Sequence, residues 1–162
     1  MGRPLLADPE LGKKFYEGRL ADVRPCIACH QGCLGRIFQG KDISCAVNPA
    51  CGREESYAIT QAETKKKVLV IGGGLGGMEA ARVCALRGHS VDLYEKTDQL
   101  GGVFIAAAAP DFKGEDRQLL EWYKKQMEDL HINVHLNQEA DEAAIQGYDE
   151  VFVATGARER KL

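Results

Sequence analysis

The stretch that decides the fold is Lys67-Val-Leu-Val-Ile-Gly-Gly-Gly-Leu-Gly-Gly-Met78. Its apolar, β-branched opening, Lys67–Ile71, is typical of a buried parallel strand. A glycine-rich turn follows, and Met78–Arg87 has the pattern of a helix that ends at Gly88. A strand, a glycine turn and a helix in this order predict the first βαβ unit of an α/β layer with a mostly parallel sheet.

The turn satisfies the pattern Gly-x-Gly-x-x-Gly with Gly72, Gly74 and Gly77. Gly72 allows the tight turn, and Gly74 lets a pyrophosphate approach the backbone. Gly77 lets the helix and the strand pack closely, and the positive end of the helix dipole would face the phosphates. We therefore expect a dinucleotide site here, the alternative being a turn that serves packing alone.

A carboxylate follows the second predicted strand, Ser90–Tyr94. This residue, Glu95, lies about 20 residues beyond the turn, where dinucleotide-binding folds use an acid on the ribose. Its carboxylate suits a ribose 2′-OH and would repel a 2′-phosphate. The sequence therefore favours FAD or NAD over NADP, unless Glu95 is only a solvated acid at the end of a strand.

Two further segments favour FAD over NAD. Leu100-Gly-Gly102 follows Glu95 shortly, and Val153-Ala-Thr-Gly156 ends a predicted strand. Both are similar to segments that line FAD in two-dinucleotide flavoproteins, so Gly102, Thr155 and Gly156 are candidate cofactor contacts. Other expected elements are a linker at residues 60–67, an amphipathic helix at 115–130 and strands at 132–136 and 150–154.

Composition excludes several classes of protein. The 162-residue chain is 44% hydrophobic and 28% charged, which is ordinary for a soluble globular protein. Its formal net charge of −3 gives no basic field for nucleic acid or anionic lipid. No apolar run approaches the roughly 20 residues of a membrane span, and Met1–Glu10 lacks the apolar stretch of a signal peptide. We expect a cytoplasmic protein with no nucleic-acid and no membrane partner.

The cysteines are concentrated, since five of the six lie between Cys26 and Cys51. Four of them have the spacing Cys26-x2-Cys29-x3-Cys33-x11-Cys45. Zinc and iron–sulfur clusters both accept four thiolates, but zinc sites more often show two paired Cys-x2-Cys knuckles. The compact triplet with one remote cysteine favours a 4Fe–4S cluster, with zinc and no metal as open alternatives.

Three residues near these motifs are given structural interpretations. His30 lies inside the cysteine triplet, and we expect a partly exposed loop residue rather than a ligand. Cys51 is expected to be a spare structural thiol. Cys84 falls in the helix after the glycine turn, where a buried cysteine behaves as a small apolar residue.

Taken together, these motifs resemble one family. Pro25–Arg36, Cys45–Pro49 and Gly52–Glu54 are similar to the iron–sulfur segment of the NADH:flavin oxidoreductases that carry barrels of the old-yellow-enzyme type. The group includes 2,4-dienoyl-CoA reductase, 2-enoate reductase and trimethylamine dehydrogenase. The resemblance implies that Cys26, Cys29, Cys33 and Cys45 bind a 4Fe–4S cluster. It also implies that the ADP half of FAD is contacted by Gly72, Gly74, Gly77 and Glu95.

The resemblance also assigns the beginning of the chain. Met1–Glu10 is similar to the end of the family's (β/α)8 barrel, where Gly2 and Arg3 would help hold an FMN phosphate. Within this segment, Asp8-Pro-Glu10 predicts a helix start with Asp8 as the N-cap. The expected ranges are 1–24 for the barrel tail, 25–60 for the cluster segment and 66–162 for part of the FAD domain. The chain departs from the family at His30, where Asn is frequent, and at Leu75-Gly76, where Pro-Ala is common.

The fold class predicted is therefore α/β: a 4Fe–4S-binding loop segment followed by a partial Rossmann-like FAD-binding domain. The resemblance implies an electron relay from NAD(P)H through FAD and the cluster to FMN, which then reduces an activated C=C bond. No catalytic residue is identified, and we expect an internal fragment whose partner is an FMN barrel in the same chain or in a separate subunit. The alternatives are a free-standing electron-transfer module and a zinc-stapled nucleotide-binding module without a redox role.

Overall fold

The computed structural model describes residues 2–157 and divides into two compact units. The cysteine unit contains the described residues up to Ala58 together with Ala108–Trp122. The glycine-turn unit contains Ile59–Ala107 together with the described residues from Tyr123 onward. The predicted linker at residues 60–67 lies just after the first boundary between them. The three sequence ranges expected for the barrel tail, the cluster segment and the FAD domain stay predictions.

The glycine-turn unit is built on one sheet of four parallel strands in the order β3-β2-β1-β4. The strands are β1 (Lys67–Ile71), β2 (Ser90–Tyr94), β3 (Asn133–His135) and β4 (Glu150–Val153). The first two have the predicted bounds, and the last two are slightly shorter than predicted. The sequence expectation of an α/β fold with a mostly parallel sheet is confirmed.

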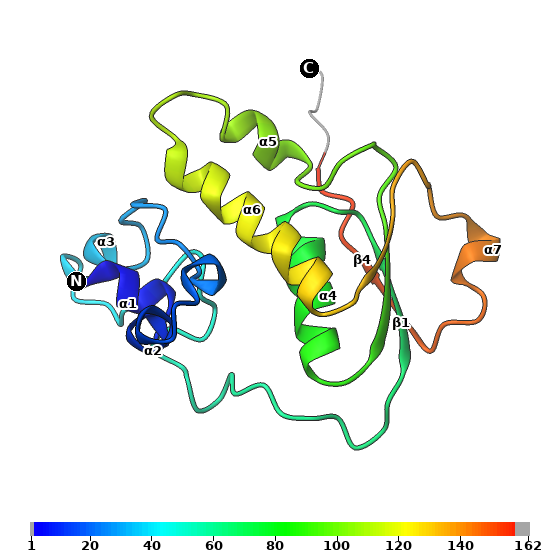
Figure 1. Cartoon of the computed structure of the whole chain (residues 1–162), viewed down its shortest axis with the longest axis horizontal. Helices are drawn as coiled ribbons and strands as arrows, with labels where there is room; N and C mark the ends of the chain where they lie inside the picture. Colours follow the sequence, from blue (N-terminus) through cyan, green and yellow to red (C-terminus); the bar gives the residue numbers. More distant parts are fainter. Residues whose placement is uncertain (1, 158–162) are drawn as a thin grey trace. The chain divides into compact units, whose positions relative to one another are not determined.

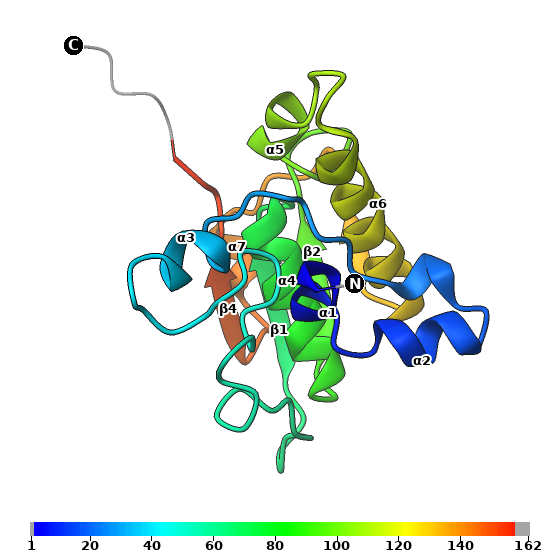
Figure 2. The same ribbon diagram turned by 90° about the vertical axis from the view of Figure 1, so that its left-hand side faces the viewer.

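The core of this unit lies around β1, the central strand with β2 and β4 on either side. Val68, Leu69 and Val70 are all buried, so β1 is covered on both faces, which is why its sequence is a continuous apolar run. Helix α4 (Leu75–Leu86) packs along the sheet, as Figures 1 and 2 both show. Met78 and Ala81 of α4 are fully buried, so this contact anchors the helix that follows the glycine turn.

Two further helices of the glycine-turn unit are short. They are α5 (Val103–Ala107) and α7 (Glu142–Ile145), and neither is predicted from the sequence. The side chain of Asp141 caps α7 by accepting a hydrogen bond from the Ala144 N–H at 2.8 Å. The long helix α6 (Gly114–Asp129) has nearly the predicted bounds, and its residues up to Trp122 belong to the cysteine unit.

The cysteine unit has little regular structure. It contains α1 (Arg3–Ala7), α2 (Leu11–Tyr16), the 3-10 helix η1 (Leu20–Asp22) and α3 (Leu34–Ile37), joined by irregular segments. Trp122 packs into it: its Nε1 donates to the Asp22 carbonyl at 3.0 Å, and the Arg24 guanidinium lies 4.7 Å from its ring centroid. Contacts between distant residues therefore hold this unit together.

The helix expected to begin at Pro9, after Asp8, begins two residues later than predicted. Helix α2 begins at Leu11 with Glu10 as its N-cap, and Asp8 is the C-cap of α1. The buried Asp8 carboxylate accepts hydrogen bonds from Lys14 Nζ at 2.7 Å and from the Arg24 N–H at 2.8 Å. Its other oxygen accepts from the Glu10 N–H at 3.0 Å, as an N-cap side chain does, so Asp8 serves the start of α2 as well as these longer-range partners. Within residues 2–157, no helix is long and apolar enough to cross a membrane.

Candidate cofactor sites

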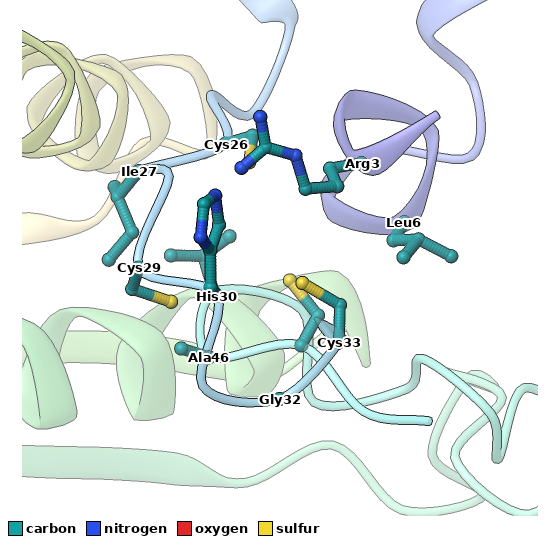
Figure 3. Close-up of a pocket in the computed structure, with 11 residues that line it drawn as sticks. Arg3, Leu6, Cys26, Ile27, Cys29, His30, Gly32, Cys33 and Ala46 are labelled. Carbon is teal, nitrogen blue, oxygen red and sulfur yellow. The ribbon is translucent and has the colours of Figure 1, made fainter. Parts of the chain in front are cut away.

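The four spaced cysteines meet at one pocket in the cysteine unit. Cys26, Cys29, Cys33 and Cys45 all line it, together with Arg3. Figure 3 shows the labelled Cys29 and Cys33 thiols directed into the space beside the loop that carries them. All four cysteines are free thiols. In the described part of the chain, no group of three or more His, Cys, Asp and Glu side chains is arranged to hold a single metal ion.

The loop between the first cysteines turns sharply. Ala28 and His30 have left-handed backbone angles, with φ of 51° and 59°. Such angles are unfavourable for residues other than glycine, by about 1–2 kcal/mol, and persist only where the surroundings hold them. The His30 carbonyl accepts a hydrogen bond from the Gly35 N–H at 2.8 Å, which fixes the end of the turn. These two angles wrap the backbone around the pocket and bring the triplet of cysteines together.

The remote Cys45 is brought to this loop by its neighbour. Ser44 donates from its backbone N–H to the Gly32 carbonyl at 2.8 Å and from its hydroxyl to the same oxygen at 3.3 Å. A Cβ on Gly32 would lie 2.5 Å from the Ser44 carbonyl oxygen, so only glycine allows this approach. The two segments of the cysteine motif are thus joined next to the pocket. Sequence analysis does not predict this contact, because nothing local marks residues twelve apart as partners.

The pocket also contains a cationic side chain. Arg3 extends toward the cysteine loop from α1, as Figure 3 shows. Among the described residues, its Nη1 is a buried side-chain nitrogen without a hydrogen-bond partner. Once deprotonated, the four thiols suit the cationic core of an iron–sulfur cluster, and the guanidinium suits a nearby anionic group. The donor set therefore fits a thiolate-ligated iron–sulfur cluster.

The other two cysteines and His30 lie where the structural interpretations place them. Cys51 and Cys84 are buried, and neither lines the cysteine pocket. Burial, with a smaller contribution from the charge of Cys45, raises the pKa of the Cys51 thiol. Burial also raises the pKa of the Cys84 thiol, which disfavours the thiolate that a metal needs. His30 is an exposed loop residue at the rim of the pocket.

In the glycine turn of the second unit, Gly72 and Gly77 have the structural roles that the sequence predicts. Gly72 has a φ of 109°, and a Cβ on it would lie 2.5 Å from the Ala154 carbonyl oxygen. A Cβ on Gly77 would lie only 1.8 Å from the Gly72 carbonyl oxygen, so Gly77 is required for the helix to approach the turn. A Cβ on Gly74, in contrast, would meet no atom within 4 Å. The open side of the turn is therefore at Gly74, immediately before the first residue of α4.

Glu95 is buried beside this turn. One carboxylate oxygen accepts from the Gly73 N–H at 2.7 Å, and the other accepts from the N–H and hydroxyl of Thr97 at 2.8 and 2.9 Å. Burial raises the pKa of the Glu95 carboxyl, but the hydrogen bonds from Thr97 and Gly73 outweigh it, and the pKa lies below its ordinary value. Glu95 is thus a fixed, ionised acceptor at the end of β2, with lone pairs left for a ribose hydroxyl.

The other expected FAD contacts gather at the same edge of the sheet. The Gly101 N–H donates to the Gly73 carbonyl at 2.8 Å, and a Cβ on Gly102 would lie 3.4 Å from the Gly74 Cα. The Ala154 N–H donates to the Ile71 carbonyl at 2.8 Å, which brings the end of β4 beside the turn. Parallel strands place their carboxyl ends together, and ligands bind there. The candidate residues that the structure brings to this edge are Gly72, Gly74, Gly77, Glu95, Gly102, Thr155 and Gly156.

The expected FMN contacts lie in the cysteine unit. Gly2 is exposed and precedes α1, and Arg3 is the first residue of that helix. The resemblance connects both residues with an FMN phosphate, and this assignment stays a prediction. That Arg3 also lines the cysteine pocket is not apparent from the sequence.

The fold and the glycine turn define a dinucleotide-binding flavoprotein. Residues 67–158 match the family of FAD dependent oxidoreductases, and the chain belongs to that family. The match begins at β1 and covers the turn, Glu95 and the end of β4. Both the geometry of the glycine turn and the family match therefore support the prediction of a flavin cofactor.

The relatives narrow the group further. The whole chain is 50% identical to part of a cinnamate reductase of Clostridium sporogenes, and 97% of it is 44% identical to part of an NADH oxidase of Thermoanaerobacter brockii. Its fold matches a solved 2-naphthoyl-CoA reductase in complex with 2-naphthoyl-CoA, with a TM-score of 0.95 and 40% identity over 99% of the chain. The chain spans about a quarter of the length of each of these proteins: 25% in all three cases. These relatives confirm the resemblance to the NADH:flavin oxidoreductase group.

Proposed function

We propose that this chain is the electron-relay portion of an NAD(P)H-dependent iron–sulfur flavoprotein that reduces an activated C=C bond. In this proposal, Cys26, Cys29, Cys33 and Cys45 ligate a 4Fe–4S cluster, and the glycine-turn unit binds FAD. Electrons pass onward to FMN, in a barrel of the same chain or of a separate subunit. The observation that carries the proposal is the meeting of all four cysteines at one pocket in a chain that also has a preformed dinucleotide turn.

The relatives support the choice of reaction. Two of them are, by name, reductases of cinnamate and of 2-naphthoyl-CoA. Both compounds carry C=C bonds conjugated with a carbonyl group, and this conjugation makes a C=C bond a hydride acceptor. An enoate or an aromatic or dienoyl-CoA ester is therefore the substrate class that we assign to the complete enzyme.

The residues of this chain bind and orient the cofactors. A flavin exchanges electrons in pairs with a nicotinamide and singly with a one-electron carrier, which is the role of an iron–sulfur cluster. The backbone around Gly74 leaves room for a pyrophosphate at the N-terminus of α4, and Glu95 provides an ionised acceptor for the adenosine ribose. Ala28, His30 and Gly32 shape the loop that presents the four thiols.

The proposal is tested by reconstituting the full chain anaerobically with iron, sulfide and FAD. The flavin is then reduced with light and a sacrificial donor, and the electrons are located by visible absorption and low-temperature EPR. We expect them on the iron–sulfur cluster of the wild type. In Cys29→Ala they should remain on the flavin, whereas Cys51→Ala, which changes a cysteine outside the pocket, should behave as wild type.

Two outcomes would contradict the proposal. The first is a wild-type chain that takes up zinc in place of iron and sulfide and shows no colour other than that of its flavin. Such a chain would be a nucleotide-binding module that zinc stabilises and that has no redox role. A chain that holds both cofactors but never passes electrons from reduced FAD to the cluster is not a relay.

A further inference from the structure

The observation that the proposed function leaves unexplained is how Cys45 keeps its position at the pocket. It is separated from Cys33 by a mostly irregular segment, and such a segment does not by itself fix the residue at its end. The contact of Ser44 with Gly32 holds the chain immediately before Cys45. The position of the thiol therefore also depends on what holds the chain immediately after it.

The contact after Cys45 comes from the side chain of Arg24, two residues before Cys26. Its Nη1 donates a hydrogen bond to the Val47 carbonyl at 2.8 Å and lies 3.4 Å from Asn48 Oδ1. Val47 follows Cys45 by two residues, and both line the cysteine pocket. A hydrogen bond from a charged donor is stronger than one between neutral groups. One guanidinium thus ties the segment that carries the fourth cysteine to the segment that carries the first.

Arg24 is itself held from two sides. Its backbone N–H donates to the buried Asp8 carboxylate at 2.8 Å. Its guanidinium lies 4.7 Å from the ring centroid of Trp122, which is a cation–π contact. Trp122 is buried, and its Nε1 donates to the Asp22 carbonyl at 3.0 Å. Since both its backbone and its guanidinium are fixed, Arg24 offers the Val47 carbonyl a donor in a fixed place.

The position of the fourth thiolate decides whether a cluster keeps all of its iron. A 4Fe–4S core bound by four cysteines has one iron for each thiolate, so displacement of Cys45 leaves one iron without its protein ligand. Removal of one electron from such a core, followed by release of that iron as Fe²⁺, leaves a 3Fe–4S core on the cysteine triplet. Loosening of Cys45 therefore has a spectroscopic signature of its own.

We propose that Arg24 is the positioning residue for Cys45: its guanidinium holds the Val47 carbonyl and thereby keeps Cys45 in place as the fourth ligand of the pocket. Arg24 acts through the backbone that follows Cys45 and is not itself a ligand. The consequence for the cluster rests on the proposed function. The placement of Cys45 by Arg24, in contrast, holds for the chain without its cluster as well.

Two measurements on the full chain test this inference. In the first, the chain is reconstituted anaerobically with iron, sulfide and FAD. Ferricyanide then removes one electron, EPR follows the 3Fe–4S signal, and a chelator takes up the released iron. In the second, iodoacetamide alkylates the chain without its cluster, and mass spectrometry gives the rate at each cysteine. Far-UV circular dichroism and the fluorescence of Trp122, the single tryptophan, report whether each variant is folded.

Three variants are compared with wild type. Arg24→Gln removes the charge and shortens the side chain, whereas Arg24→Lys keeps a cation that can donate to the Val47 carbonyl. Arg53→Gln is the matched control, because Arg53 is an exposed arginine of the same unit that does not line the pocket. Its guanidinium lies 5.9 Å from the ring centroid of Tyr57, so the control loses the same charge and the same kind of ring contact.

We expect the 3Fe–4S signal of Arg24→Gln to appear about tenfold faster than that of wild type, as is usual when a residue that orients a metal ligand is lost. Alkylation should become faster at Cys45 but not at the three cysteines of the triplet. Loss of a nearby cation alone slows alkylation, because it disfavours the thiolate, so a faster reaction reports displacement. Arg24→Lys should recover most of both changes, and Arg53→Gln should behave as wild type.

Each other outcome overturns the inference or the proposed function. An Arg24→Gln variant that matches wild type in either measurement shows that Cys45 is held without Arg24. Acceleration at all four cysteines, or loss of the wild-type circular dichroism, makes Arg24 a residue of general stability. An Arg24→Lys variant as impaired as Arg24→Gln shows that donation to Val47 is not the cause. A wild-type chain that forms no cluster refutes the proposed function, and the alkylation rates then decide the role of Arg24 by themselves.

Discussion

The two units of this chain build their sites in opposite ways. In the glycine-turn unit the site follows from the sheet: β1, β2 and β4 end at one edge, and backbone hydrogen bonds place the turn there. In the cysteine unit the site is held by a few contacts between distant residues, such as that of Ser44 with Gly32. A site fixed by regular backbone survives the loss of its ligand, whereas one made of thiols on a loop depends on the group that the thiols bind.

The largest effect that this comparison predicts is on metal binding. Cys29→Ala should abolish the visible spectrum of the iron–sulfur cluster and lower bound iron to background, since a cubane needs its four thiolates. The glycine-turn unit does not use this residue, so FAD should still bind with unchanged affinity. Iron and sulfide analysis together with fluorescence titration of FAD checks both parts.

The control for this variant is Cys51→Ala, which alters a buried cysteine of the same unit. It should retain the full iron content, because Cys51 does not line the pocket. Equal iron loss in the two variants would mean that the ligand set has been assigned incorrectly.

The next effect concerns the architecture of the glycine turn. Gly77→Ala should destabilise the chain by about 3 kcal/mol or more, because its Cβ would lie 1.8 Å from the Gly72 carbonyl oxygen. The neighbouring Gly76→Ala meets no atom within 4 Å and should stabilise α4 by up to about 1 kcal/mol through its helix propensity. Urea unfolding followed by circular dichroism measures both, and similar free energies for the two variants would contradict the close packing inferred at Gly77.

A smaller effect at the same turn distinguishes the affinity for FAD from the stability of the fold. Gly74 has φ −73° and ψ 177°, angles that alanine adopts readily, and a Cβ there would face open space. Gly74→Ala should therefore leave the free energy of unfolding of the apo chain within about 0.5 kcal/mol of wild type. It should weaken FAD binding about tenfold, or about 1.4 kcal/mol, because the methyl group stands where the pyrophosphate approaches. Unchanged affinity for FAD would place the phosphates elsewhere.

The smallest effect is a dependence of stability on pH. The pKa of Glu95 is lower in the folded chain than in the unfolded chain, so its ionised carboxylate stabilises the fold above the unfolded pKa. This contribution is lost as the pH falls through the folded pKa. Glu95→Gln should cost about 1 kcal/mol at pH 7, because an amide nitrogen cannot accept the hydrogen bond that one of the two carboxylate oxygens accepts from Gly73 or Thr97.

The same variant should approach wild type in acid. Urea unfolding at neutral pH and again below the ordinary carboxyl pKa compares the two proteins under both conditions, and the difference between them should narrow in acid. A difference that stays constant between the two pH values would show that the charge of Glu95 is not what stabilises the turn.

The difference between the two units also explains which of their features the sequence predicts. The strands Lys67–Ile71 and Ser90–Tyr94 were predictable because their burial leaves a local apolar pattern, and the glycines of the turn because the backbone needs them. In the cysteine unit, the cysteine spacing predicted that four thiols would meet, but other local patterns were incomplete. Asp8 resembles an N-cap and accepts from the Glu10 N–H, but its carboxylate is also used by Lys14 and by the backbone of Arg24. The placement of Arg3 at the cysteine pocket depends on such long-range contacts, which no local pattern encodes.

The most direct test of the central claim is the cofactor content of the full chain after anaerobic reconstitution in the presence of iron, sulfide, zinc and FAD together. The expected content is about four iron atoms, about four sulfide ions and about one FAD per chain, with little zinc. A chain that binds one zinc ion with its cysteines, or that takes up FAD without iron, would contradict it.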